Sequence, residues 1–391
     1  MVKPFQFSRL PKILFKNGAI SQLPSIIKQY GNEIILVTGK SSFLSSTAAE
    51  KLFSEFRAKG IVFHLVTVSG EPTPELVNNA VNKFRSEKIS LVTGIGGGSV
   101  LDAGKAIAAM MYRRESVTEF LEGVGTKEHP GSTLPFIAIP TTSGTGSEAT
   151  KNAVISNVGP NGFKKSLRHD NFVPDIALVD PELTLNCPRE ITASSGMDCF
   201  TQLVESYLSD KSCEYTDALA LEGLKAIKDS LLKSYIDSTN IGARSGMSFA
   251  ALTSGICLAN AGLGAVHGFA SSVGGMFDIP HGLICGTLMA SANEINVREL
   301  RKVPDRHLAL KKYSLLGELF SEIKGQSEDY YTDSFIFFLH TLTGQLNLPA
   351  LNMNMINEKY IEFICHNTEI KNNPVKLSPD DLKDILKARV L

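Results

Sequence analysis

Short apolar runs and amphipathic stretches alternate through the first half of the chain. Apolar runs that end at glycine or at polar turns predict β-strands over residues 32–39, 61–70, 89–96, 134–140 and 176–180. Helical spacing of apolar residues predicts helices over 45–60, 74–88 and 99–111. Alternation of this kind is typical of a parallel sheet covered by helices on both faces, so we expect an α/β domain.

The pattern changes after about residue 188, where strand signals fade. Helical spacing predicts helices over residues 191–209, 214–236, 242–262 and 306–324. A short helix is expected near the end, because Ser378 can cap it and Pro379 suits its first turn. We therefore divide the chain into an α/β domain over residues 1–187 and an all-α domain over residues 188–391.

Composition excludes several classes of protein. The 391 residues are 43% hydrophobic and 20% charged, and 39 Lys and Arg balance 40 Asp and Glu. A net charge of −1 offers no basic excess for nucleic acid and no acidic tail for a partner. The six cysteines are scattered without a CxxC pair, which predicts reduced thiols and no disulfides.

One segment has the length of a membrane span. Residues 245–277 contain no Asp, Glu, Lys or Arg, but Ser, Thr, Asn, His and many glycines interrupt the segment. We interpret it as buried helices around a polar site. The first twelve residues resemble neither a signal peptide nor an anchor, so we expect a cytoplasmic protein with no membrane partner.

Two loops rich in Gly, Ser and Thr follow apolar strands. Residues 96–99 read GGGS and open a helix, where free backbone N–H groups and the helix dipole favour a pyrophosphate. GGGS alone could equally be a tight strand–helix turn. The second loop, residues 140–148, favours the binding interpretation, because both loops would meet where parallel sheets bind nucleotides.

Four polar residues in the second half could hold a divalent metal. Asp198 and Gln202 are four residues apart and share one face of a predicted helix. His267 and His281 lie in or near the charge-free segment. A carboxylate, an amide oxygen and two imidazoles are suitable metal donors, although a single buried histidine is more often a core residue.

These segments together resemble the iron-containing (group III) alcohol dehydrogenase family. The matching motifs are GGGSVLDAGKAIA from Gly96, PTTSGTGSEAT from Pro140, VPDIALVDPELTLNCP from Val173, GMDCFTQLVESYLS from Gly196, HGFASSVGGMFDIPHG from His267, and NPVKLSPDDLKDIL near the end. The resemblance implies a dehydroquinate-synthase-like fold. The α/β domain would bind NAD(P) and the helical domain would bind metal and substrate, with both sites in the cleft between them.

The resemblance also implies cofactor contacts. The family's pyrophosphate loop matches Gly96, Gly97, Gly98 and Ser99, followed by Asp102, and its second cofactor loop matches Thr141, Thr142, Ser143 and Thr145. The family's lysine after these loops matches Lys165. The positions that line the family's cofactor cleft match Leu183 and Thr184. Lys165 could equally be a solvated lysine and Leu183 a core residue.

Two positions depart from the family's pattern. The family binds Fe(II) or Zn through one aspartate and three histidines, which here match Asp198, His267 and His281, with Gln202 in place of a histidine. Gln202 either ligates the metal weakly, which we favour, or hydrogen-bonds another ligand. Ser271 replaces the second histidine of the family's HxxxH; a hydroxyl relays protons but is no general base near neutral pH.

The end of the first strand bears on cofactor choice. Family members often carry an aspartate there, which repels the 2′-phosphate of NADP. This chain has Gly39, Lys40, Ser41 and Ser42, so we expect NADP to be accepted and slightly favoured over NAD.

The resemblance implies metal-dependent hydride transfer between NAD(P) and a small alcohol or aldehyde. The alternatives are a metal-free reductase similar to maleylacetate reductases and a catalytically inactive nucleotide-binding protein.

Phe269 and Phe277 are expected on an apolar pocket wall. We expect a homodimer or larger homo-oligomer, and the N-terminal segment is expected to add an edge strand to a partner or to its own sheet.

Overall fold

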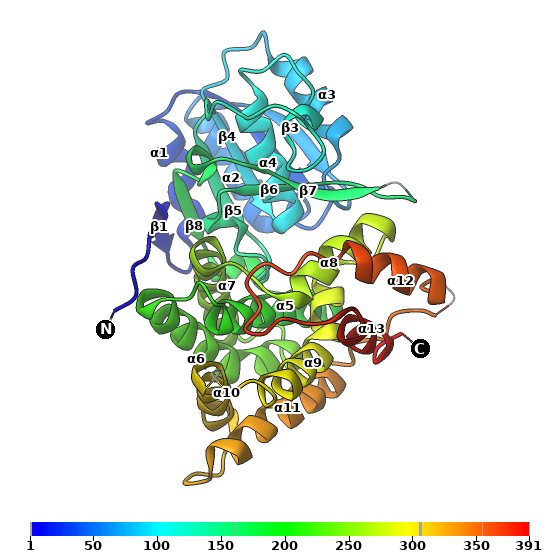
Figure 1. The fold of residues 1–391 in the computed structure, drawn as a ribbon. Coiled ribbons are helices and arrows are strands. Elements are labelled where there is room, and N and C mark those ends of the chain that lie inside the picture. Colours follow the sequence, from blue (N-terminus) through cyan, green and yellow to red (C-terminus); the bar gives the residue numbers. More distant parts are fainter. Residues whose placement is uncertain (1, 161, 305–306, 354, 391) are drawn as a thin grey trace.

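The computed structural model describes residues 2–160, 162–304, 307–353 and 355–390. An α/β region lies above a helical region in Figure 1, and the chain passes from one to the other near residue 185. The last element of the α/β region is η5 (Pro181–Thr184), and α5 (Arg189–Leu208) begins the helical region. The proposed division at residue 187 falls between these elements and stays a prediction.

A six-stranded parallel sheet forms the α/β region, as predicted. Its order is β1 (Lys12–Phe15), β8 (Ile176–Val179), β5 (Phe136–Pro140), β4 (Leu91–Gly96), β2 (Glu33–Gly39) and β3 (Val62–Val68). The N-terminal segment adds β1 to the chain's own sheet, with Lys12 opposite Ile176. Gly96 lies opposite Pro140, so the two glycine-containing loops leave the sheet side by side.

Helices cover both faces of this sheet because its strands are apolar on both faces. Ile34 and Leu36 pack with α1 (Leu23–Ile27) and α2 (Thr47–Ala58), whereas Ile35 and Val37 pack with α3 (Pro74–Phe84) and α4 (Gly98–Met110). The helices begin at clear signals: Ser46 Oγ accepts from the N–H of Ala49, and Thr73 caps α3.

An antiparallel hairpin, which the periodicity did not reveal, leaves the α/β region. It consists of β6 (Asn152–Asn157) and β7 (Phe163–Arg168). The hairpin reaches over α8 (Ala265–Met276), as Figure 1 shows, and the N–H of Gly159 donates to the carbonyl of Gly275 at 3.3 Å. It therefore connects the two regions beside the site described below.

The second region is helical, apart from an isolated bridge between Leu351 and Val390 in the described residues. Its further helices are α6 (Glu214–Ile236), α7 (Ile241–Ala261), α9 (His281–Leu300), α10 (His307–Phe320), α11 (Glu328–Gln345), α12 (Glu358–Asn367) and α13 (Pro379–Lys387). Residue 306, where the helix over residues 306–324 was expected to begin, lies outside the described residues. Ser378 and Asp381 form the capping box of α13, which confirms the expected helix start.

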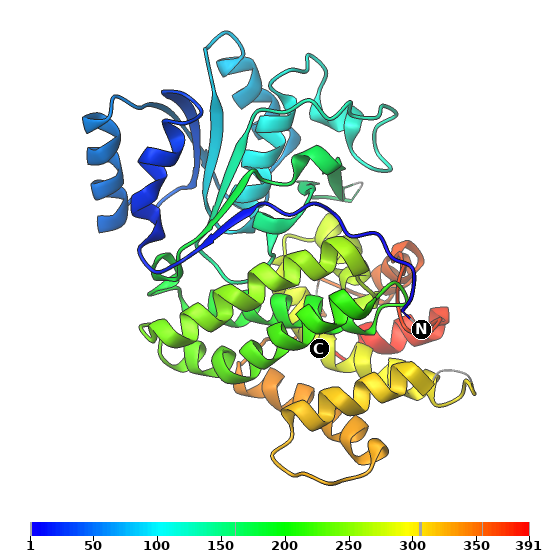
Figure 2. The same cartoon turned by 90° about the vertical axis from the view of Figure 1, so that its left-hand side faces the viewer.

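Helix α5 is the centre of the helical region. Most of its side chains are buried, because α6, α7 and α9 pack around it (Figure 2). Among the described residues, no single helix is long and apolar enough to cross a membrane; only α7 and α8 together pass that test, with a 98° bend between them. Both helices contribute to the buried core, which agrees with the interpretation of residues 245–277.

Candidate active site

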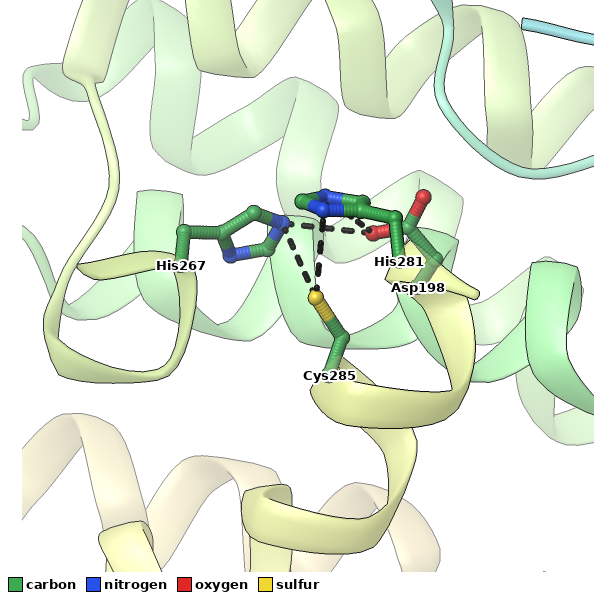
Figure 3. Close-up of side chains that lie close together, drawn as sticks. All are labelled: Asp198, His267, His281 and Cys285. Atoms are coloured by element: carbon green, nitrogen blue, oxygen red, sulfur yellow. Dashed lines mark hydrogen bonds and ion pairs between the residues drawn. The ribbon is translucent and has the colours of Figure 1, made fainter. Parts of the chain in front are cut away.

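Four side chains converge between α5, α8 and α9. They are Asp198, His267, His281 and Cys285 (Figure 3), and their potential donor atoms all lie within 4.8 Å of one another. Asp198 Oδ1 is 3.2 Å from His267 Nε2 and 3.7 Å from His281 Nε2. Cys285 Sγ is 3.7 Å from each of these two nitrogens. Sequence analysis named the first three residues and missed Cys285.

Helical spacing and close helix packing bring these side chains together. His281 is the first residue of α9, and Cys285 lies one turn later on the same face. A Cβ at Gly282 would lie 2.4 Å from the carbonyl oxygen of Ser194, so this glycine lets the start of α9 approach α5. His267 stands in the first turn of α8.

Four of the six separations among these atoms are close to those of a tetrahedral metal centre. Zinc bonds of about 2.0 Å to nitrogen or oxygen and about 2.3 Å to sulfur require separations of about 3.3 Å between two nitrogen or oxygen donors and about 3.5 Å between sulfur and either of them. The observed separations are 3.2 and 3.7 Å for the oxygen–nitrogen pairs and 3.7 Å for both sulfur–nitrogen pairs. These four separations are therefore close to those that such a metal requires, and the remaining two lie within 4.8 Å.

Burial and mutual contact shift the pKa values in this cluster. Burial lowers the pKa of His281 to about 4 and raises that of Cys285 to about 12. Burial also raises the pKa of Asp198, but the two imidazoles outweigh it and leave that pKa below its usual value. For His267, burial lowers the pKa, but Cys285 and Glu205 outweigh it and raise the pKa well above its usual value.

Glu205 orients His267 from behind. Its Oε2 lies 2.7 Å from His267 Nδ1, and its Oε1 accepts from the N–H of Val266 at 2.7 Å. If a metal replaced the Nε2 proton, this carboxylate would keep the remaining N–H on Nδ1, so that the Nε2 lone pair would face the cluster. Sequence analysis missed Glu205; the available signal was an acidic residue seven positions after Asp198, two helical turns along the same face.

Gln202 is buried beside the cluster and already hydrogen-bonded. Its amide nitrogen donates to Asp198 Oδ1 at 3.4 Å, and its amide oxygen accepts from Ser254 Oγ at 2.8 Å. Ser254 Oγ also lies 3.5 Å from the carbonyl oxygen of Gly144 in the second cofactor loop. This arrangement favours the hydrogen-bonding role over direct ligation.

The other residues expected near the substrate occupy different settings. Ser271 Oγ, on the exposed side of α8, donates to the carbonyl oxygen of His267 at 3.1 Å. Phe269 is 0% exposed and belongs to the helical core, so the expectation that it lines an open pocket is wrong. Phe277 is partly buried and packs edge-on against Tyr360, with ring centroids 5.4 Å apart.

The two glycine-containing loops lie against each other, as predicted. The N–H of Thr141 donates to the carbonyl of Gly96. A Cβ at Gly97 would lie 3.2 Å from Thr142 Oγ1, and one at Gly98 would lie 2.5 Å from Thr145 Cγ2. Glycine is therefore needed for this close approach. Ser99 lies in the first turn of α4, and Ser143 Oγ lies 3.4 Å from Ser248 Oγ in the helical region.

Asp102 holds the second loop through hydrogen bonds. It accepts from Ser147 Oγ at 2.5 Å and from the N–H of Val154 at 3.1 Å. Lys105 is fully buried one turn later, where its ammonium group donates to the Ser147 carbonyl at 2.9 Å. The carboxylate of Asp102 is thus already bound to the protein at both oxygens.

The remaining cofactor candidates differ in position. Gly39 ends β2 at the carboxyl edge of the sheet, and Lys40 and Ser41, which follow it, are exposed. Lys165 is half exposed and pairs with Glu369 at 3.5 Å, whereas its neighbour Lys164 is buried and pairs with Glu71 at 2.9 Å.

Leu183 and Thr184 lie in η5. Leu183 is partly buried against the sheet's core, and the Thr184 hydroxyl donates to the carbonyl of Pro181 at 2.8 Å. These observations leave their proposed place beside the cofactor as a prediction.

The fold and the cluster together define a protein of two regions, in which a set of potential metal ligands lies beside two adjacent glycine-containing loops. Comparison with known proteins identifies the family. Residues 11–181 match the iron-containing alcohol dehydrogenase family, and residues 192–390 match the C-terminal part of the Fe-containing alcohol dehydrogenase family. The chain therefore belongs to the iron-containing alcohol dehydrogenase family.

Individual relatives match along nearly the whole chain. The NAD-dependent methanol dehydrogenase of Bacillus methanolicus is 27% identical, covering 96% of this chain and 97% of that protein. The NADPH-dependent butanol dehydrogenase of Clostridium saccharobutylicum is 28% identical, covering 96% of each. The crystal structure of ADH/D1, an archaeal halo-thermophilic alcohol dehydrogenase from a Red Sea brine pool, superposes with a TM-score of 0.89 at 25% identity, covering 100% of this chain and 99% of that one.

Proposed function

We propose that this protein is a metal-dependent, NAD(P)-linked alcohol dehydrogenase that also reduces aldehydes. Asp198, His267 and His281 would hold the metal, and the loop Gly96–Ser99 would hold the cofactor's pyrophosphate. A divalent metal bound here would supply a Lewis acid for the oxygen of the alcohol or carbonyl, and NAD(P) would accept or donate the hydride.

The connection between the cluster and the cofactor loop carries this proposal. Gln202 bonds to Asp198 and to Ser254, and Ser254 also approaches Gly144 of the second loop. The reacting carbon and the nicotinamide must meet within one cleft, and the closeness of the cluster to the second loop supports such a meeting.

The protein's own groups would position the reactants and exclude water. Glu205 holds His267 with Nε2 toward the cluster. Backbone N–H groups at the start of α4 face the expected pyrophosphate, where the helix dipole favours negative charge. Ser271 offers a hydroxyl beside α8, but since its hydrogen bond is made to the His267 carbonyl, we assign it no role as a base.

We further propose that NADP is accepted and slightly favoured. Gly39 places no carboxylate at the end of β2, and Lys40 adds a cation to the same exposed turn. One relative is NADPH-dependent and another NAD-dependent, so the family supports both.

Metal removal tests the proposed function. After chelation, verified by elemental analysis, we expect turnover of a panel of alcohols and aldehydes to disappear while NADPH fluorescence titration still shows binding. Zinc or Fe(II) should restore activity in wild type but not in His267→Ala. Full activity in verified metal-free protein would instead indicate a metal-free reductase. NADPH binding without turnover under every metal condition would indicate an inactive nucleotide-binding protein.

A further inference from the structure

Cys285 differs from the other buried cysteines in its surroundings. Its side chain is 0% exposed, yet its sulfur faces two imidazoles and lies in a cluster with the Asp198 carboxylate (Figure 3). By comparison, the sulfur of Cys257, also 0% exposed, has a backbone carbonyl as its partner, that of Thr216 at 3.7 Å. A sulfur placed only to fill space would not need three metal-type donors around it.

The position of Cys285 suits coordination from the same helix as His281. The two residues are four apart on α9, so both side chains point from one face toward α5 and α8. The sulfur is 3.7 Å from both Nε2 atoms, close to the separation of about 3.5 Å that sulfur and nitrogen show on one tetrahedral zinc ion.

Gln202 is less well prepared to coordinate. Its amide oxygen accepts from Ser254, and its amide nitrogen is the end that faces Asp198. To coordinate, the amide must turn over, lose the hydrogen bond to Asp198 and exchange its contact with Ser254.

We propose that the Cys285 thiolate, not the Gln202 amide, supplies the fourth protein donor to the metal. This inference rests on the proposed metal-dependent function and extends it to the ligand set. The thiol proton passes to solvent as the sulfur–metal bond forms, because a coordinating thiol is deprotonated.

The thiolate strengthens the preference of the site for zinc. With Asp198 it places two negative charges against a divalent ion, and a soft sulfur donor favours zinc over harder ions. We therefore expect this chain to retain zinc more tightly than Fe(II), despite the name of its family.

X-ray absorption of the zinc-loaded, full-length protein tests the ligand set directly. Wild type is expected to show one sulfur neighbour at about 2.3 Å and nitrogen or oxygen neighbours at about 2.0 Å. Cobalt(II)-loaded wild type should show the strong near-ultraviolet absorption of a thiolate–cobalt bond. Cys285→Ser should lose both signals and weaken zinc binding by more than about 100-fold, since changing the outer partners of a site alone costs about 10- to 100-fold.

Two further variants make the test specific. Cys257→Ser alters another buried helical cysteine and should keep the sulfur signals and the zinc affinity. Gln202→Leu should keep the sulfur signals as well. The measurements on wild type need no variant, so misfolding of Cys285→Ser leaves the test intact.

The outcomes separate this inference from the proposed function. Bound metal that restores activity but has only nitrogen and oxygen neighbours would overturn the role of Cys285 and leave the metal-dependent function standing. Failure of the wild type to bind zinc, cobalt or Fe(II) would overturn both. A sulfur signal that survives in Cys285→Ser would also overturn the assignment.

Discussion

Replacing Glu205 by glutamine should weaken metal binding without a change at any proposed ligand. The carboxylate accepts two hydrogen bonds of 2.7 Å, from the N–H of Val266 and from Nδ1 of His267. A glutamine has one amide oxygen for these two donors. If the oxygen keeps His267, the amide NH₂ group opposes the Val266 N–H and a buried bond is lost, at about 1–3 kcal/mol. If it keeps Val266, His267 takes the tautomer with Nε2 protonated, which cannot ligate.

Either arrangement reduces zinc affinity. Outer partners of ligating histidines typically contribute about 10- to 100-fold, or about 1.4–2.7 kcal/mol, to metal affinity. Chelator competition on Glu205→Gln should therefore show zinc binding weaker by at least about tenfold, with NADPH binding unchanged. Glu222→Gln, which alters only an exposed pair with Lys225, is the matched control and should match wild type. Unaltered zinc affinity in folded Glu205→Gln protein would refute the orienting role.

Two further predictions concern the α/β region. Gly39→Asp should raise the NADP Kd at least fivefold and leave the NAD Kd nearly unchanged, since unit charges about 4 Å apart near a surface repel by about 1–4 kcal/mol. The new Cβ fits, because its nearest neighbour, Ser42 Oγ, is 3.9 Å away. Gly344→Asp, at an exposed position of α11, is the control. An equal loss of affinity for both cofactors in Gly39→Asp would contradict the prediction. Lys105→Met should lower the free energy of unfolding by about 3–5 kcal/mol, because it leaves a buried charge network unpaired. Burial lowers the pKa of Lys105 from 10.5 to about 8, so between these pH values the unfolded chain binds more protons than the folded chain. The stability of wild type relative to Lys105→Met should therefore rise with pH in this range. Denaturant titrations from pH 7 to 10.5 that show a constant or falling stability difference would contradict this prediction.

Much of the fold was predictable because the four central strands of the sheet are buried on both faces. Runs such as residues 34–37 are apolar without alternation, which is the signature of an interior parallel strand. The hairpin β6–β7 was not predicted, because polar residues make up more than half of its two strands, NAVISN and FKKSLR, and interrupt the apolar pattern. Its stability depends on contacts with α8 and α4 that lie far away in the sequence.

The site was predictable where residues share one helix and less so where helices meet. The spacing of Asp198 and Gln202 placed both on one face of α5. Periodicity cannot say which side chains of α8 and α9 approach α5, so Cys285 appeared only in three dimensions. The lysines of β7 show the same limit: because strand neighbours point to opposite faces, the structure buries Lys164 and leaves Lys165 half exposed.

The change from histidine to glutamine at position 202 makes physical sense if the metal has another fourth donor. Asp198 is buried, so an apolar residue at position 202 would remove a hydrogen bond from it, whereas Ser254 Oγ would keep the carbonyl oxygen of Ala251 at 2.8 Å. Glutamine keeps the hydrogen bond to Asp198 and also offers its amide oxygen to Ser254. Cys285 approaches the same imidazoles from α9 and needs no change in the backbone. On this reasoning, Gln202→His adds a fifth candidate donor to a site that already has four. The sulfur signal of the wild type should therefore persist in that variant.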